Sequence, residues 1–119
     1  IAEIQADRFQ SVRRLQLKYD GVVVLKGAGT LIQAGQERAT ALCTDGNPGM
    51  ATGGMGDVLT GVIASLLAQD HDPELAASMG VCIHAAAADK AAEHGERGLL
   101  AADLMPIIRE LINPEMDQC

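Results

Sequence analysis

Two short segments of this 119-residue chain combine glycines with an ionisable side chain, a pattern typical of anion binding. The longer one covers residues 47–61 and reads NPGMATGGMGDVLTG. It leads directly into an apolar run, residues 58–67, which predicts a helix. Glycines before a helix leave backbone N–H groups uncovered, and these groups bind anions with help from the helix dipole. Asp57 falls within the first turn, where a phosphate and a base could meet.

The chemistry expected of this segment is transfer of a charged group. We predict that the amides of Gly54, Met55 and Gly56 form an anion hole. Asp57 among such amides is predicted to stay ionised, so it is a candidate general base for a substrate hydroxyl. The alternative is an ordinary capped helix with a flexible glycine lead-in. Four glycines between positions 49 and 56 argue against that alternative.

The second segment consists of Lys26, Gly27, Ala28, Gly29 and Thr30. It follows a β-branched run that predicts a buried strand, so it places a cation and free amides at the C-terminal end of that strand. Ligands of open α/β sheets bind in this position. The alternative is a solvent-facing lysine followed by glycines that only turn the chain. Two segments suited to phosphate binding occur in one short chain, which favours a binding function over a chance pattern.

Several other site types are missing from the sequence. There is no G-x-x-x-x-G-K-[ST] segment, and the dinucleotide pattern G-x-G-x-x-G fails because Ile32 and Leu59 occupy its last position. No G-x-S-x-G elbow occurs. The histidines share no ligand spacing, so no metal site is predicted, and His84 is interpreted as a satisfied core histidine.

The elements that must position these segments can be read from hydrophobic spacing. Continuous β-branched residues predict a strand buried on both faces at 22–25, and two further runs predict a hairpin. Asp72 followed by Pro73 is a helix start. The expected helices are 6–19, 54–69, 73–93 and 102–112, and the expected hairpin strands are 31–33 and 38–43, with Pro114 beyond the last helix.

Composition narrows the function classes. The net charge is −7 and aromatic residues are only 2% of the chain, which disfavours binding to nucleic acid or to anionic membranes. Most basic side chains are interpreted as solvated helix faces: Arg8, Arg13, Arg14, Lys18 and Arg38. Three scattered cysteines suit a reducing cytoplasm, and Cys43 and Cys82 are expected to be buried. No apolar run is long enough to span a bilayer.

These residues also carry a family resemblance. The runs VVVLKGAGTLI, NPGMATGGMGDVLTGVIA and GERGLLAADL resemble the ADP/ATP-dependent NAD(P)H-hydrate dehydratases, the carbohydrate-kinase-related domain of YjeF-type repair proteins. The likeness covers residues 6–112, and the second run is highly specific. It implies a ribokinase-like three-layer α/β/α fold. A G-x-G-D motif alone would indicate only the ribokinase-like superfamily.

The resemblance implies a reaction and roles for individual residues. The reaction is dehydration of the S epimer of hydrated NADH or NADPH, driven by ADP or ATP with Mg²⁺. Residues 26–30 and Gly56 would contact the nucleotide, and Asp57 would face the hydrated nicotinamide. Asp57 would take the proton of the 6-hydroxyl while that oxygen attacks the terminal phosphoryl group, and the phosphate would then be expelled by the ring nitrogen lone pair.

The resemblance also implies how much of the domain is present. A complete dehydratase domain is about twice this length, so residues 1–119 are expected to be its C-terminal half. Residues outside the chain would supply much of the dinucleotide pocket and the Mg²⁺ ligands. A cytoplasmic homo-oligomer, of four subunits by resemblance, is expected. The open alternatives are a ribokinase-like small-molecule kinase and a nucleotide-binding module without catalysis.

Overall fold

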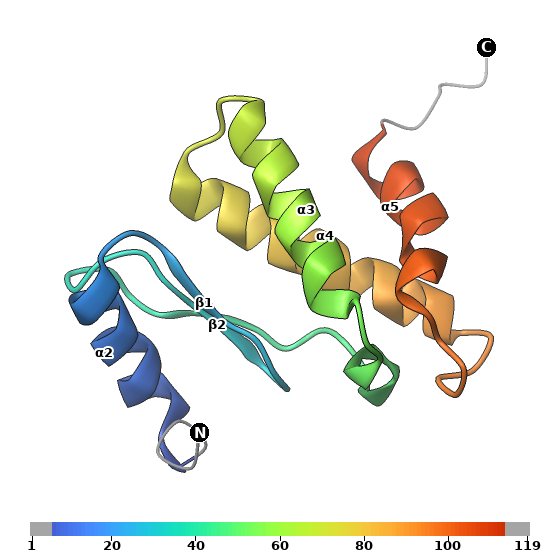
Figure 1. Ribbon diagram of the computed structural model, residues 1–119, viewed down its shortest axis with the longest axis horizontal. Helices are drawn as coiled ribbons and strands as arrows, with labels where there is room; N and C mark the ends of the chain where they lie inside the picture. The colour runs from blue at the N-terminus through green and yellow to red at the C-terminus, as the bar shows by residue number, and fades with distance from the viewer. Residues whose placement is uncertain (1–5, 114–119) are drawn as a thin grey trace.

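A three-stranded sheet lies between one helix on one face and a helical pair on the other (Figure 1). The computed structural model describes residues 6–113. Its elements are α2 (Arg8–Tyr19), β1 (Val23–Leu25), β2 (Thr30–Gln33), β3 (Ala41–Cys43), η1 (Pro48–Ala51), α3 (Met55–Ala68), α4 (Pro73–Ala92), η2 (Ala101–Asp103) and α5 (Leu104–Ile112). α2 contacts β1 and β2, α4 contacts β2 and β3, and α5 packs on α4. This layering confirms the mixed α/β architecture expected from the sequence.

α2 begins and ends at residues whose side chains and backbone suit those positions. The Asp7 carboxylate accepts a hydrogen bond of 2.9 Å from the Gln10 amide and caps the helix. Asp20, with φ of 60°, leaves the helical conformation and ends it. Val12 is fully buried under the sheet, whereas Phe9, three positions earlier and also apolar, is 52% exposed. Apolar residues of this helix are therefore not all buried.

The sheet is antiparallel throughout, in the order β1-β2-β3. Val24 pairs with Ile32, and Leu31 pairs with Leu42, so the predicted hairpin of β2 and β3 is confirmed. The expectation that residues 22–25 are buried on both faces is wrong, because each β1 residue is only half-buried. β1 forms an edge of the described sheet, and the fully covered strand is β2.

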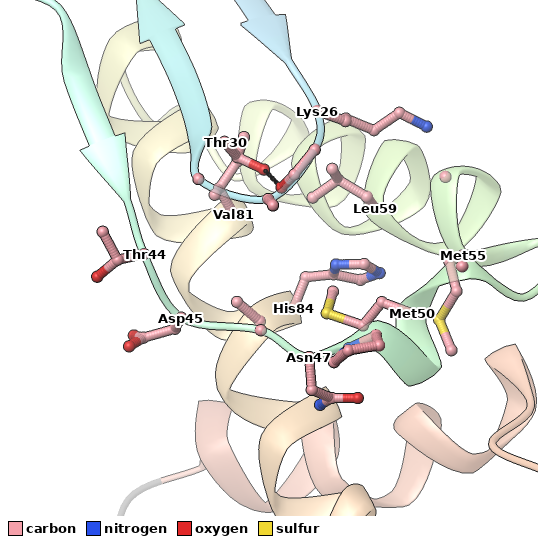
Figure 2. Close-up of a pocket in the computed structure, with 18 of the residues that line it drawn as sticks. Lys26, Thr30, Thr44, Asp45, Asn47, Met50, Met55, Leu59, Val81 and His84 are labelled. Atoms are coloured by element: carbon pink, nitrogen blue, oxygen red, sulfur yellow. Dashed lines mark hydrogen bonds between the residues drawn. The ribbon is translucent and has the colours of Figure 1, made fainter. Parts of the chain in front are cut away.

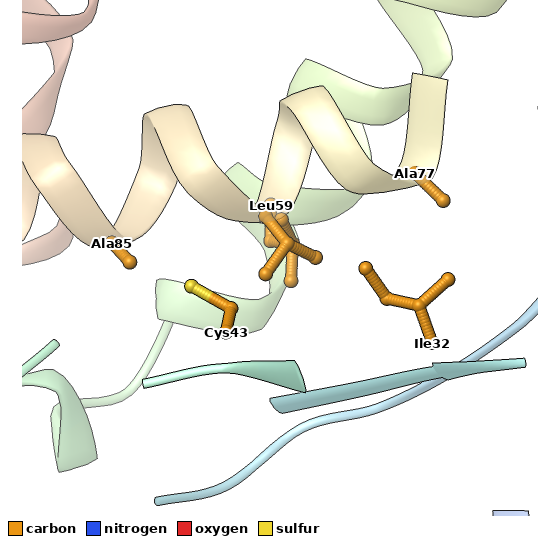
Figure 3. Close-up of a cluster of buried hydrophobic side chains, with 6 residues drawn as sticks. Ile32, Cys43, Leu59, Ala77 and Ala85 are labelled. Atoms are coloured by element: carbon orange, nitrogen blue, oxygen red, sulfur yellow. The ribbon is translucent and has the colours of Figure 1, made fainter. Parts of the chain in front are cut away.

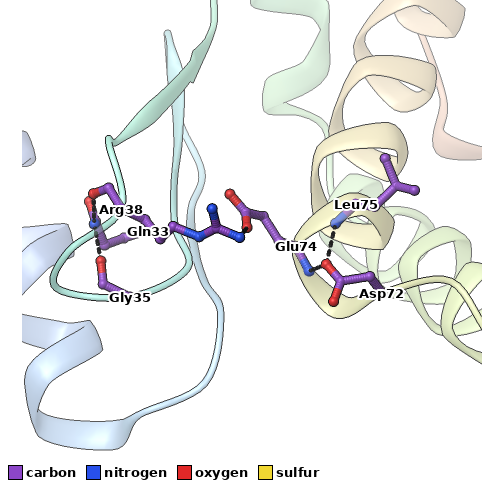
Figure 4. A network of polar contacts seen from close by, with 6 residues as sticks. All are labelled: Gln33, Gly35, Arg38, Asp72, Glu74 and Leu75. Carbon is purple, nitrogen blue, oxygen red and sulfur yellow. Dashed lines mark hydrogen bonds and ion pairs between the residues drawn. The ribbon is translucent and has the colours of Figure 1, made fainter.

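The hairpin loop is held by a buried glutamine. Gln33 has no exposed surface, and its side-chain amide donates to the carbonyls of Gly35 (2.6 Å) and Arg38 (2.8 Å). Its carbonyl oxygen accepts from the Thr40 hydroxyl. Arg38 then forms an ion pair of 2.8 Å with Glu74 in the first turn of α4 (Figure 4). These bonds tie the hairpin to the start of α4.

α4 is the central helix, and its small residues let its neighbours approach closely. Asp72 caps it by accepting from the amides of Glu74 and Leu75, and Pro73 occupies its first turn, as predicted. A methyl group on Gly80 would lie 2.6 Å from Ile63 Cγ1, so α3 and α4 touch at this glycine. No described helix is long and apolar enough to cross a membrane.

The buried side chains form two clusters, one on each side of α4. The first joins the sheet to α3 and α4 (Figure 3): Ile32, Cys43, Leu59, Ala77, Val81 and Ala85. The second joins α3 and α4 to α5: Met55, Ala87, Ala88, Leu99, Leu104 and Ile108. Leu59 and Met55 lie one turn apart on α3 and belong to different clusters. The start of α3 is thereby fixed from both sides.

The cysteines depart from expectation. Cys43 is buried as predicted, but Cys82 is exposed on α4, so the prediction that both are buried is wrong. Burial raises the pKa of the Cys43 thiol; a backbone hydrogen bond at Asp45 opposes this rise, and the nearby Cys82 thiol adds to it. Two cysteines 39 positions apart therefore meet between β3 and α4. Cys119 and Pro114 lie outside the described residues.

Candidate functional site

A cavity of about 660 Å³ opens where two loop regions and the start of α3 meet α4 (Figure 2). Its walls come from the lysine loop (residues 26–30), the glycine turn (residues 44–56, with gaps) and the α4 face around His84. This volume lies within the usual range of small-molecule sites. Both segments that the sequence singled out therefore line one cavity.

The lysine loop is held from behind by Arg8 of α2. Arg8 Nη1 donates to the carbonyls of Ala28 (2.8 Å) and Gly29 (2.7 Å), and Nη2 donates to the carbonyl of Leu25 (3.1 Å). The expectation that Arg8 lies on a solvated helix face is wrong. Its guanidinium binds two carbonyl oxygens of the loop and one at the end of β1, which leaves the loop amides to other partners.

Gly27 is what allows this arrangement. A Cβ on Gly27 would lie 2.8 Å from Arg8 Nη2 and 3.2 Å from Cζ. The Gly27 φ of 157° also lies at the edge of the range that side chains rarely adopt. The Thr30 hydroxyl completes the loop by donating to the Gly27 carbonyl at 3.4 Å. Close packing of guanidinium on backbone explains the glycine here.

The glycine turn is held by a carboxylate from α4. Asp89 accepts from the Gly46 amide (3.0 Å) and from the Asn47 side-chain amide (2.9 Å). Asn47 in turn caps η1 by accepting from the Gly49 amide. Farther along, the Thr52 hydroxyl bonds to the carbonyls of Gly49 (2.9 Å) and Leu99 (2.8 Å), which anchors the turn to the segment before η2.

The first turn of α3 is open to an anion. Gly54 precedes it with φ of 91°, and no side chain caps it. The Met55 amide bonds to the Thr52 carbonyl at 3.5 Å, whereas within residues 6–113 no acceptor pairs with the amides of Gly56 or Asp57. Of the three residues expected to form the anion hole, Met55 and Gly56 line the cavity, and Gly54 lies outside its lining.

Lys26 brings the two segments into contact. A methyl group on Gly56 would overlap the Lys26 ammonium, so this ammonium lies directly against the helix start. A cation beside two unpaired amides forms a concentrated positive region. This arrangement can hold a phosphate group without any further side chain.

Asp57 stands apart from the cavity. Its side chain is exposed and does not line the cavity wall. Asp57 nevertheless shares the first turn of α3 with Gly56, which does line it.

His84 projects from α4 into the cavity between Leu59 and Met50 (Figure 2). Only 5% of its surface is exposed, and Nε2 is buried with no hydrogen-bond partner among the described residues. His84 is buried in the core as predicted, but the expectation that its polar atoms are satisfied is wrong. Burial lowers the pKa of His84; a backbone hydrogen bond at Met55 opposes this change, and the Lys26 charge reinforces it.

Sequence reasoning missed three side chains that shape this site: Arg8, Asp89 and His84. Arg8 gave no local signal, because its partners lie 17 to 21 residues away. Asp89 and His84 did give a local signal in the sequence. Both are polar residues within an alanine-rich helix that packs on its neighbours on two sides, and a buried polar residue normally needs a partner.

Comparison with known proteins agrees with this geometry. The family model for NAD(P)H-hydrate dehydratase matches residues 1–110. The chain belongs to the NAD(P)H-hydrate dehydratase family. This finding confirms the resemblance read from the two glycine-containing segments.

Curated relatives include the bifunctional NAD(P)H-hydrate repair enzyme of Vibrio cholerae, 57% identical over 114 residues. That match covers 95% of this chain but 23% of the relative. The ADP-dependent (S)-NAD(P)H-hydrate dehydratase of Neisseria meningitidis is 43% identical, over 95% of this chain and 38% of its own. The chain thus spans less than half the length of each of these relatives.

A solved structure is also similar. The ADP/ATP-dependent NAD(P)H-hydrate dehydratase of Bacillus subtilis, co-crystallised with ATP and Mg²⁺, superposes with a TM-score of 0.84 at 33% identity. The match covers 92% of this chain and 40% of the Bacillus chain. The described residues therefore have the ribokinase-like α/β fold that the sequence predicted.

Proposed function

We propose that this chain carries the nucleotide site of an ADP- or ATP-dependent dehydratase that restores NADH or NADPH from the S epimer of its hydrate. The observation that supports it most is the meeting of the lysine loop and the α3 start at one cavity. Names of the Neisseria and Bacillus relatives support the same reaction. The enzyme would be a lyase that acts in metabolite repair.

The cavity suits a nucleotide's phosphates at one end. Lys26 supplies a charge, and the amides of Gly56 and Asp57 have no other partner among the described residues. The lysine loop adds its own amides, because Arg8 holds its carbonyls on the opposite side. We propose that residues 26–30 and Gly56 bind the nucleotide, with Gly54, Met55 and Gly56 as the anion hole.

Asp57 is proposed as the general base. Its carboxylate would accept the proton of the 6-hydroxyl of the hydrated nicotinamide, as that oxygen attacks the terminal phosphorus of the nucleotide. The bond from this phosphorus to its bridging oxygen breaks, which releases the shortened nucleotide. The ring nitrogen lone pair then expels the new phosphate ester as inorganic phosphate and leaves an iminium ion between the nitrogen and C6. Loss of a proton from C5 restores the C5–C6 double bond and the neutral reduced nicotinamide. The exposure of Asp57 outside the cavity lining leaves room for this second substrate.

Mg²⁺ fits this chain only as a companion of the nucleotide. Across residues 6–113 no three His, Cys, Asp or Glu side chains gather as a cation site. Asp89 is already engaged by Gly46 and Asn47. Mg²⁺ usually keeps waters and is held by one or two carboxylates together with phosphates. When bound, it would offset phosphate charge and would be held mainly by the nucleotide's own phosphates and by waters.

The chain's place in a larger assembly is also a proposal. The coverage of 38% and 40% in the two dehydratase relatives supports residues 1–119 as the C-terminal half of one dehydratase domain. A cytoplasmic homo-oligomer, of four subunits by family likeness, is proposed with it. Exposed apolar side chains on α5, Met105 and Ile112 among them, are consistent with burial by another chain. Light scattering of the intact protein measures the subunit number.

The experiment uses the intact protein that carries this sequence. ADP and ATP are titrated by calorimetry, and the recovery of reduced-nicotinamide absorbance is then followed with the S and R hydrates. Nucleotide-dependent recovery from the S hydrate alone supports the proposal. Accumulation of a stable phosphorylated compound would instead indicate a ribokinase-like kinase. Nucleotide binding without any turnover would indicate a binding module and overturn the proposed reaction.

A further inference from the structure

The His84 imidazole has an unused hydrogen-bonding atom inside the cavity. The residue is 5% exposed, lines the cavity, and its Nε2 has no partner within residues 6–113. Buried polar atoms in folded proteins are nearly always paired, so an orphan of this kind calls for an explanation. Figure 2 shows the ring among Leu59, Met50 and Met55. A bound molecule is the partner that the position offers.

The chemistry of the missing partner follows from the other ring nitrogen. A backbone hydrogen bond at Met55 raises the pKa of His84, so the imidazole is its donor and the Met55 carbonyl accepts. We assign this proton to Nδ1, because Nε2 is the ring atom left without a partner. In a neutral ring Nε2 is then a lone-pair acceptor. Its partner must be a hydrogen-bond donor.

The charges around the ring favour this neutral form. Desolvation lowers the pKa of His84, and the Lys26 ammonium across the cavity lowers it further. Asp45 is the carboxylate that lines the same cavity, but it is exposed. With Lys26 held against the α3 start, a second cation at His84 would add like charge at the same site.

These features divide the cavity into two ends. The end with Lys26 and Gly56 offers a cation and amides, which suit phosphate oxygens. The part around His84 offers apolar walls from Leu59 and Val81 and the buried acceptor Nε2. A phosphate presents only acceptors there, whereas a nucleoside presents hydroxyl and amino donors.

We propose that His84 Nε2 accepts a hydrogen bond from the nucleoside part of the bound nucleotide, either a ribose hydroxyl or the amino group of adenine. His84 is then a specificity-determining residue of the nucleotide site. The inference rests on the proposed function of the same cavity. The inference specifies that the nucleoside part of the nucleotide lies against α4.

The test compares ADP with three analogues on the intact protein, by calorimetry. The analogues are 2′-deoxy-ADP, 3′-deoxy-ADP and purine riboside diphosphate, which lacks the amino group. The wild type should bind one of these analogues roughly three- to tenfold more weakly than ADP. A loss of this size corresponds to one missing hydrogen bond. His84→Phe should bind ADP more weakly by the same factor and show no further loss with that analogue. His94→Gln, an exposed histidine, should keep the wild-type discrimination.

A second measurement needs no variant. Nitrogen NMR of histidine-labelled wild type should show a neutral Nδ1–H tautomer of His84 whose Nε2 resonance shifts when ADP is added. Equal affinities for ADP and all three analogues, discrimination unchanged in His84→Phe, or a silent Nε2 resonance each overturn the inference while ADP binding stands. Absence of ADP binding to the wild type would overturn the proposed function together with it.

Discussion

The lysine loop and the glycine turn face the same cavity, but they are held in place by opposite chemistry. A cation, Arg8, engages the carbonyls of the lysine loop, whereas an anion, Asp89, engages an amide of the glycine turn. Because Arg8 binds carbonyl oxygens, the amides of the lysine loop stay available to a ligand. Asp89, in contrast, occupies an amide of the glycine turn. At the α3 start no side chain caps the helix, and the amides of Gly56 and Asp57 have no acceptor within residues 6–113.

This difference assigns separate tasks to the two regions. The lysine loop offers a charge and amides for binding. Asp57, which directly follows the glycine turn, carries the carboxylate proposed as the general base. We therefore expect changes in the lysine loop to affect binding, and changes at Asp57 to affect turnover.

Asp57→Asn should produce the largest effect. The amide keeps the size and the helix start but cannot accept a proton as a base, so kcat should fall by about 10²- to 10⁴-fold. ADP affinity should change little, because the nucleotide is held by the backbone and by Lys26. Steady-state kinetics with the S hydrate and ADP titration measure the two quantities.

If Asp57→Asn weakened ADP binding and left kcat intact, Asp57 would serve binding and not turnover, contrary to the division of tasks proposed above. Asp45→Asn is the matched control, since Asp45 is another exposed carboxylate beside the cavity. It should retain most of the wild-type kcat. Comparable losses in both variants would show that charge alone, and not the position of Asp57, matters.

Gly56→Ala should produce the next largest effect, on binding. The added methyl overlaps the Lys26 ammonium, which must move away from the α3 start. Loss of this cation from the phosphate site should weaken ADP binding by about tenfold, the scale of one charge-assisted hydrogen bond. Calorimetric titration with ADP measures it.

Gly61→Ala serves as the control on the same helix. Nothing lies within 4 Å of a Cβ at Gly61, so the variant gains helix propensity without a clash. Its ADP affinity should equal that of the wild type, and its free energy of unfolding should rise by up to about 1 kcal/mol. Equal ADP affinity in both alanine variants would remove Lys26 from the phosphate site.

Arg8→Met tests the support of the lysine loop. Three hydrogen bonds from a charged donor disappear, so we expect a loss of about 1–3 kcal/mol in the free energy of unfolding and weaker ADP binding. Arg14→Met removes a neighbouring exposed arginine of α2 and should do neither. Urea unfolding and ADP titration check both. An Arg8→Met protein with wild-type ADP affinity would show that the loop holds its shape unaided.

The sequence predicted the local features of the site well, because they arise from neighbouring residues. The glycines before α3, the Asp72 cap and the hairpin of β2 and β3 depend on residues a few positions apart. Each follows from backbone conformation or capping. The element bounds differ from expectation by only a few residues for the same reason.

The sequence could not predict contacts between distant elements. Arg8 looked like any charged residue of an amphipathic helix, since the carbonyls it binds lie beyond the next strand. The half-burial of β1 depends on its edge position in the described sheet, which no local pattern encodes. Cys82 and His84, two positions apart on α4, have opposite exposures that only packing decides.

The smallest effect we expect concerns acid stability at the α4 side of the cavity. The pKa of buried His84 lies below its usual 6.5, so the unfolded chain binds this proton more readily than the folded one. The free energy of unfolding should therefore be at its full value above pH 6.5 and should decrease as the pH falls below it, through the folded pKa. Replacing His84 by Phe removes this contribution, so the variant should lose less stability over the same interval. Thermal unfolding measured across that pH range checks this prediction. The control His94→Gln, at an exposed position, should follow the wild-type curve. Parallel curves for all three proteins would mean that His84 has the same pKa in the folded and unfolded chains.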